Sequence, residues 1–199
     1  MKKLIIAFAF IVTLFPFSKV KAQDDSYFNM YYSMSLATGK FNDYMSPYSW
    51  RGFGMEWRAE EGDKLMIGVR ADWNTFYKAM DYGTYESGTQ SISGKQYRYT
   101  NTFPMALTPS YYKDFNETAR LTLGCGIGTT YLMRDTDFGV YRIEKNTWQF
   151  LLAPEATFTF DLDANRALYL GVRYNNNFNS SKLDGQSFLQ FNVGLSYNQ

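Results

Sequence analysis

The chain has 199 residues, enough for one domain, and its 20 basic and 19 acidic residues give a formal net charge of +1. It has no histidine and one cysteine, which excludes a Ser-His-Asp triad, a histidine-ligated metal, an internal disulfide and a cysteine-rich zinc site. Aromatic residues make up 19% of the chain, so their placement is the first feature to explain.

The first 22 residues have the layout of a secretory signal peptide. A basic start at 1–3 is followed by an apolar run over 4–17 and by Val20-Lys21-Ala22, with small residues at the −3 and −1 positions before Gln23. A membrane-spanning helix needs about 20 apolar residues, and this run is shorter. Removal of 1–22 takes away four lysines and no acid. The mature chain then has 16 basic and 19 acidic residues and a net charge of −3, which does not suit a nucleic-acid partner.

The rest of the chain, 23–199, alternates apolar residues with polar or small ones, which is the pattern of β-strands. Eight strands are predicted, at 27–38, 50–59, 64–77, 96–111, 118–133, 147–160, 166–175 and 187–197. Short connections at 60–63, 113–117 and 161–165 alternate with longer polar ones at 40–49, 78–95, 134–146 and 176–186. An even number of strands with connections of this kind predicts an all-β, eight-stranded antiparallel up-and-down barrel in one domain.

The positions of the lysines indicate which face of this barrel points outward. A solvated outer wall would carry scattered lysines. Those of the mature chain all fall in connections or at strand ends: Lys40, Lys64, Lys78, Lys95, Lys113, Lys145 and Lys182. The sequence therefore favours a transmembrane barrel, apolar outside and polar inside, over a soluble ligand-carrying barrel.

Charged residues on the polar face are expected in the lumen, which side chains fill in a barrel of eight strands. They are Glu56, Arg58, Arg70, Asp72, Arg98, Arg120, Glu155 and Arg173. Because arginine forms forked hydrogen bonds to carboxylates and stays charged when enclosed, we expect a structural ion-pair network. A path for protons or ions is the alternative.

Aromatic residues are expected in two girdles around an aliphatic band, the pattern of membrane interfaces. The girdle next to the long connections comprises Trp50, Trp73, Tyr97, Tyr99, Tyr131, Trp148 and Tyr174. The other comprises Phe28, Trp57, Tyr111, Phe158, Phe160 and Tyr197. The band between them holds Ile67, Val69, Leu121, Leu123, Leu170 and Val193.

A few residues disagree with the alternation. Pro104 and Pro154 fall inside strands, where a missing N–H predicts bulges or local ladder defects. Strand register is expected to slip near four residues on the wrong face, namely Asn101, Leu132, Leu151 and Phe188. Cys125 lies on the outer face and is interpreted as a small apolar residue.

These features together resemble the small outer-membrane β-barrel proteins of Gram-negative bacteria. The signal peptide ending Val-Lys-Ala, the eight alternating strands and the last strand, Phe-Leu-Gln-Phe-Asn-Val-Gly-Leu-Ser-Tyr at 188–197, are similar to the OmpA/OmpX-like barrel group, of a Bacteroidetes type. Barrels of that group usually end in Phe, whereas this chain ends Tyr197-Asn198-Gln199. The resemblance implies residence in outer-membrane lipid, insertion by the barrel-assembly machinery, periplasmic termini and extracellular long loops.

Three functions remain open. The first is a non-enzymatic barrel that supports the membrane or binds an extracellular partner through loops such as 78–95. The alternative is a narrow channel or transporter for small solutes, suggested by the charged lumen. An enzyme acting on lipids comes last, because the barrel enzymes of this kind rely on histidine. We expect no catalytic residue, cofactor or metal.

Overall fold

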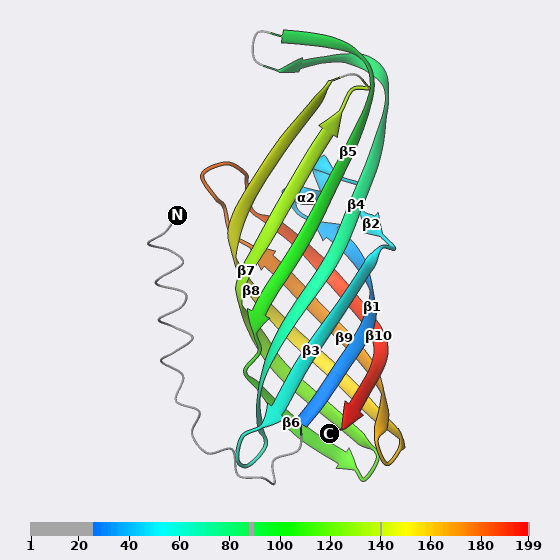
Figure 1. Ribbon diagram of the computed structural model, residues 1–199, viewed down its shortest axis with the longest axis vertical. Helices are drawn as coiled ribbons and strands as arrows, with labels where there is room; N and C mark the ends of the chain where they lie inside the picture. The colour runs from blue at the N-terminus through cyan, green and yellow to red at the C-terminus, as the bar shows by residue number, and fades with distance from the viewer. Residues whose placement is uncertain (1–25, 88–89, 140, 199) are drawn as a thin grey trace.

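The computed structural model describes residues 26–87, 90–139 and 141–198, and the predicted signal peptide at 1–22 lies outside them. The described chain forms a tilted, closed β-barrel (Figure 1). Its elements are β1 (Ser26–Thr38), α2 (Lys40–Tyr44), β2 (Tyr48–Ser49), β3 (Gly52–Glu60), β4 (Leu65–Ser87), β5 (Gln90–Leu107), β6 (Ser110–Asn116), β7 (Ala119–Asp137), β8 (Arg142–Asp163), β9 (Arg166–Asn177) and β10 (Gln186–Asn198).

These elements make eight barrel strands, because two of the strands are interrupted. β2 and β3 both pair with β1 and form one strand. β5 and β6 form another, and the main chain of Thr108 between them keeps two hydrogen bonds to Gly68, of 2.8 and 3.2 Å. All pairing is antiparallel, and β10 pairs with β1 along its length to close the barrel. The predicted all-β, eight-stranded up-and-down barrel is confirmed.

Strand pleating sorts the side chains as the alternation predicts. Along β3, Phe53, Met55 and Trp57 are at least 40% exposed on the outer wall, whereas Glu56 and Arg58, which alternate with them, are buried. The outer wall is therefore apolar and the lumen polar, the arrangement expected in lipid. Among the described residues, no helix is long and apolar enough to cross a membrane.

The outer wall also shows the two aromatic girdles. One end of the barrel, here called the short-turn end, holds the start of β1, the end of β10 and the tight turns; the other is the loop end. Exposed aromatic residues near the loop end include Trp50, Trp73, Tyr99, Trp148 and Tyr174. Those near the short-turn end include Trp57, Tyr111, Phe160 and Tyr197. The wall between them exposes Ile67, Val69, Leu123, Leu170 and Val193.

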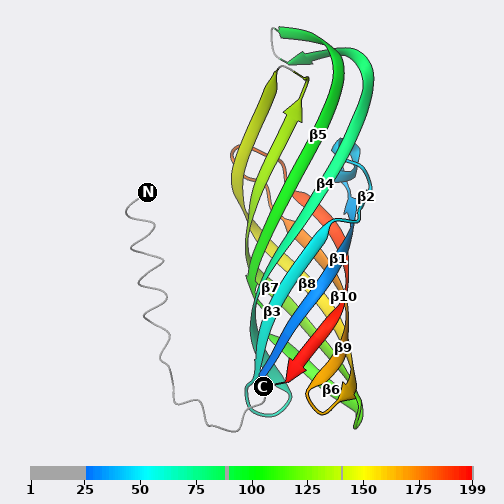
Figure 2. The same cartoon turned by 45° about the vertical axis from the view of Figure 1, so that its right-hand side comes forward.

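Two of the predicted long loops are strands instead. The described residues of 78–95 continue the pairing of β4 with β5, and those of 134–146 continue the pairing of β7 with β8 as far as Asp137 and Arg142. Both extend beyond the barrel as hairpins that rise past the other strands (Figures 1 and 2). The prediction of loops there was wrong for a physical reason. A strand that has left the lipid needs no apolar outer face, so the alternation fades although the backbone ladder goes on.

The two prolines inside strands cause local ladder defects, as predicted, without displacing their strands. The β4–β5 ladder omits the pairs next to Pro104, and the β8–β9 ladder omits Pro154, since proline has no N–H to donate. The register is the same on both sides of each interruption.

The expected slip of register does not occur at the four misfit residues. Leu132, Leu151 and Phe188 are fully buried in the lumen, and Asn101 stays on the outer side, where it accepts a 2.7 Å hydrogen bond from Thr75. The register shifts lie elsewhere, near Met80, Asp114 and Asp161. The prediction failed because it assumed an entirely polar lumen, whereas this lumen also has apolar layers.

Candidate functional site in a closed lumen

Six of the eight charged residues predicted in the lumen come together halfway along it. They are Glu56 and Arg58 on β3, Arg70 and Asp72 on β4, Glu155 on β8 and Arg173 on β9. We call them the central ion-pair cluster. Each side chain is at most 3% exposed, and three arginines balance three carboxylates. A buried charge is tolerated only when it is paired, and this cluster meets that condition.

Glu155 lies at the centre of the cluster. Its Oε1 accepts a 2.7 Å hydrogen bond from Arg58 Nη2, and its Oε2 accepts bonds from Arg70 Nη1 (3.1 Å) and Arg173 Nε (2.7 Å). Glu155 is the only acid of the cluster in contact with all three of its arginines. Its removal would therefore leave every arginine short of a partner.

Two stacked tyrosines complete the cluster. Tyr31 donates a 2.8 Å hydrogen bond to Asp72, and Tyr169 donates one of 3.3 Å to Glu56. The two rings stack with their centroids 5.1 Å apart. The tyrosines thus satisfy carboxylate oxygens and also fill the cross-section of the lumen.

Glycines opposite the cluster make room for it. A Cβ atom at Gly54 would overlap both the ring of Tyr31 and the carboxylate of Asp72. One at Gly126 would lie 2.7 Å from Nη2 of Arg70. The cluster therefore depends on residues that have no side chain as well as on the charged ones.

Arg120, the seventh predicted residue, lies apart from the cluster near the short-turn end. It forms 2.6 Å ion pairs with Glu60 and Asp114 and donates a 3.0 Å hydrogen bond to the hydroxyl of Tyr27. Its guanidinium also stacks on the ring of Tyr112, 4.2 Å from the centroid. Arg120 thus belongs to a separate group at the mouth of the barrel.

Arg98, the eighth, lies at the loop end. It donates hydrogen bonds of 2.9 Å to Gln96 Oε1 and to the main-chain oxygen of Tyr44, and it stacks over the Tyr44 ring at 4.4 Å. It forms no ion pair with any residue in the described parts of the chain. The eight predicted residues therefore occupy three separate places.

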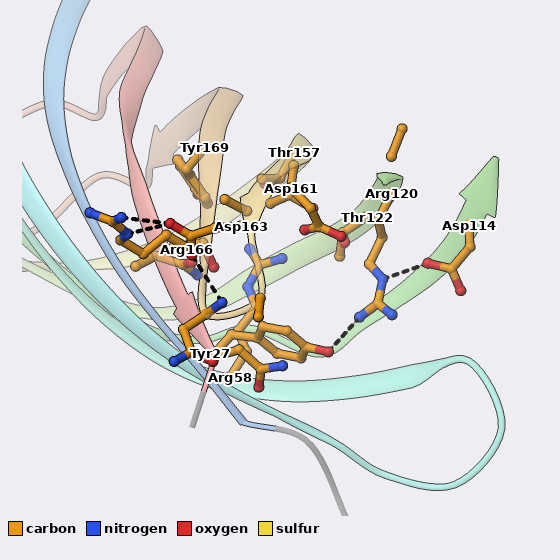
Figure 3. Close-up of a pocket in the computed structure, with 18 of the residues that line it drawn as sticks. Tyr27, Arg58, Asp114, Arg120, Thr122, Thr157, Asp161, Asp163, Arg166 and Tyr169 are labelled. Carbon is orange, nitrogen blue, oxygen red and sulfur yellow. Dashed lines mark hydrogen bonds and ion pairs between the residues drawn. The ribbon is translucent and has the colours of Figure 1, made fainter. Parts of the chain in front are cut away.

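A cavity of about 650 Å³ opens between the central cluster and the short-turn end. Arg58 and Tyr169 line its inner end, so the cluster closes it. Figure 3 shows Arg120 reaching Tyr27 and Asp114, and Arg166 beside Asp163, along its walls. The hydrogen bond from Arg166 holds the pKa of the exposed Asp163 carboxyl below its ordinary value.

An apolar layer closes the loop end. α2 places Phe41, and Met45 directly after it, against Ala37, Phe76 and Phe188. The rings of Phe41 and Phe76 meet edge to face at 4.8 Å. The sequence did not predict this layer, because the connection at 40–49 was interpreted as polar. The i, i+4 spacing of Phe41 and Met45 and the inward position of Phe188 are the signals that locate it.

The lumen is thus sealed at two levels, by charge at its centre and by apolar side chains at the loop end. Each carboxylate of the cluster is held by arginine, which leaves none free to act as a general base. In the described ranges, no group of three or more potential metal ligands is found. The arrangement is suited to stabilising and closing the barrel.

Comparisons with known proteins agree with this architecture. No protein family and no curated protein matches the sequence. Among solved structures, the chain is similar to Ail, the attachment invasion locus protein of Yersinia pestis, solved in complex with the heparin analogue sucrose octasulfate, with a TM-score of 0.55, 15% identity and 88% of this chain and 99% of that chain covered. Neisserial surface protein A is similar with a TM-score of 0.54, 14% identity and coverage of 87% and 96%. OprG of Pseudomonas aeruginosa has a TM-score of 0.56, 14% identity and coverage of 88% and 96%.

At these identities the likeness concerns the fold. It covers nearly the whole of each solved barrel. It agrees with the apolar outer wall and the polar, filled lumen of this chain. The protein has the closed, eight-stranded fold of bacterial outer-membrane barrels.

Proposed function

We propose that this outer-membrane barrel does not conduct solutes and acts at the cell surface, where its two long hairpins capture an extracellular partner. The observation that carries the proposal is the combination of a sealed lumen with strands that continue beyond it. β4 and β5 pair as far as Ser87 and Gln90, and β7 and β8 as far as Asp137 and Arg142.

The two hairpins contact each other and together form one surface. Tyr85 on the first hairpin contacts Phe138 at the tip of the second, with ring centroids 5.7 Å apart. Tyr82 on the first hairpin and Tyr141 on the second are also exposed. Exposed aromatic side chains on a rigid support provide contact area at a low cost in conformational entropy, which suits recognition. The complex of Ail with a heparin analogue supports the idea that a barrel of this fold can hold a ligand.

The proposal includes an orientation and a route to the membrane. The residues at 1–22 would direct export and be removed, and the barrel-assembly machinery would insert 23–199 into outer-membrane lipid. The termini would then face the periplasm and the hairpins the exterior. The apolar outer wall between the aromatic girdles supports this placement.

A shortened hairpin tests the binding function. A variant that joins Lys78 to Arg98 through an Asn-Gly turn lacks 79–97 and keeps the pairing of these two residues. We expect bacteria that express it to adhere to immobilised glycans and matrix proteins about tenfold less than those with the intact barrel, since a central contact surface is lost. Heat-modifiable migration on gels checks that the shortened barrel folds. Equal adhesion of the two, or no adhesion above vector-bearing cells, overturns the proposal.

A narrow channel is the second candidate, favoured by the cavity open toward the short-turn end. Single-channel recording on the refolded protein separates the two functions. We expect no discrete conductance, because the central cluster and the apolar layer both lie across the lumen. Regular conductance steps would favour the channel.

A further inference from the structure

Four basic residues lie in a row on the inward face of β4, β5, β7 and β8, where these strands pass the apolar layer. They are Lys78, Arg98, Arg134 and Lys145, and we call them the basic stripe. Lys78 is the cross-strand partner of Arg98, and Arg134 is the partner of Lys145. Arg134 is paired with Thr100, two residues from Arg98, so the two arginines are diagonal neighbours. The stripe therefore crosses four adjacent strands without interruption.

On the outer face of β7 and β8, by contrast, the basic residue is paired with acids. There Arg142 forms a 2.7 Å ion pair with Asp135 and a 3.1 Å one with Glu144. The hydrogen bond to Asp135 raises the pKa of the Arg142 guanidinium above its ordinary value. The outer-face arginine is thus neutralised by two carboxylates, whereas the stripe on the other face is basic throughout.

Two acids on neighbouring elements face the stripe without neutralising it. Asp43 of α2 offers its main-chain oxygen to Lys78 at 3.4 Å. Asp184, on the loop after β9, attracts Arg134 electrostatically but forms no ion pair with it. Like charges placed opposite each other on paired strands are destabilising, so the stripe has a cost in the free protein.

Stacking holds the two arginines of the stripe in place. Arg98 and Arg134 both stack on Tyr44, with guanidinium carbons 4.4 and 4.1 Å from the ring centroid. Stacking fixes the plane of a guanidinium and leaves its N–H groups for other partners. Arg98 also donates to Gln96 and to the main-chain oxygen of Tyr44, whereas the donors of Arg134 and Lys145 are not engaged by other described residues.

We infer that the basic stripe binds a soluble saccharide that carries several sulfate or phosphate ester groups. Arginine matches the oxygens of both groups with forked hydrogen bonds. Three strand spacings give the stripe a length of about 14 Å, enough for more than one anionic group. The stripe lies on the inward face, away from the lipid, so its ligand would arrive from the exterior through the loop end. This inference rests on the proposed surface function and names the class of ligand.

Titration of the refolded full-length mature barrel in uncharged detergent tests the inference. The probes are sucrose octasulfate and inositol hexakisphosphate, with sucrose and inositol as neutral controls. We expect saturable binding of both anions that weakens with salt, and no binding of the neutral sugars. The double variant R134Q/K145Q should bind about tenfold or more weakly, because two charge-assisted contacts are lost.

R142Q is the matched control, since it removes a charge from the outer face of the same strand. It should change the affinity less than about twofold, a loss of at most about 0.4 kcal/mol. K145R should keep the affinity of the native chain, and K145Q alone, at an exposed position, gives a readout that does not depend on the packing around Tyr44.

Three results overturn the inference: no saturable binding, an equal loss in R142Q and R134Q/K145Q, or binding of an anionic lipid added to the detergent micelles but of neither soluble anion. The adhesion of cells with intact hairpins is measured separately, and none of these three results predicts its loss. A failure of the stripe is therefore distinguishable from a failure of the surface function.

Discussion

The central ion-pair cluster and the basic stripe lie on the same inward face, and β4 and β8 contribute to both, yet their charges are arranged in opposite ways. In the cluster, three arginines meet three carboxylates, and every side chain is buried. In the stripe, four cations follow one another, and Lys145 is exposed.

The difference follows from access to water. Charges enclosed in the lumen must be paired, because an unpaired one would lose its solvation without compensation. Charges on the outer side of the apolar layer, at the loop end, remain partly hydrated and are free to be unbalanced, at a small cost. Balanced charges therefore mark the part of the lumen that holds the barrel together, and an excess of positive charge marks the part available to a ligand.

Breaking the cluster at Glu155 should have the largest effect. Glu155→Gln leaves three buried arginines with two acids, and we expect the free energy of unfolding to fall by about 3–5 kcal/mol. Urea unfolding in lipid vesicles measures it. Glu144→Gln, an exposed change on the same strand, is the control and should alter the midpoint little. An unchanged midpoint for Glu155→Gln would show that the cluster contributes nothing to stability.

Crowding the cluster should have a smaller effect. Gly54→Ala places a methyl group against Tyr31 and Asp72, and overpacking of this kind costs about 1–3 kcal/mol. Gly94→Ala in the first hairpin is the matched control, since a Cβ there meets no atom within 4 Å. The same unfolding assay compares the two. Equal stability of both variants would mean that the cluster can shift to accept the methyl group.

Removing a charge from the stripe should have the smallest effect, with no loss of stability. Lys145→Gln relieves repulsion from Arg134, so we expect the free energy of unfolding to stay within about 0.5 kcal/mol of the native value or to rise. Added salt should stabilise the native barrel more than the variant, since it screens the repulsion. A loss above about 1 kcal/mol would show instead that Lys145 has a stabilising partner in the folded barrel.

Local patterns were sufficient to predict the barrel wall. A side-chain period of two, combined with an outer wall in lipid, determines which residues of a strand such as β3 face the lumen. Parity also placed Glu56, Arg58, Arg70, Asp72, Glu155 and Arg173 on the inner face. Parity carries no information on the position of a residue along the barrel axis, so it did not separate Arg120 and Arg98 from the cluster.

The sequence alone determined the strand number, the closed antiparallel fold and the polarity of the two faces, because these depend on a periodicity that each strand carries by itself. Only the tertiary structure decided which charges meet, that α2 and Phe188 close the loop end, and that four basic residues form a stripe. Those features depend on the stagger between neighbouring strands, which brings together residues far apart in the chain.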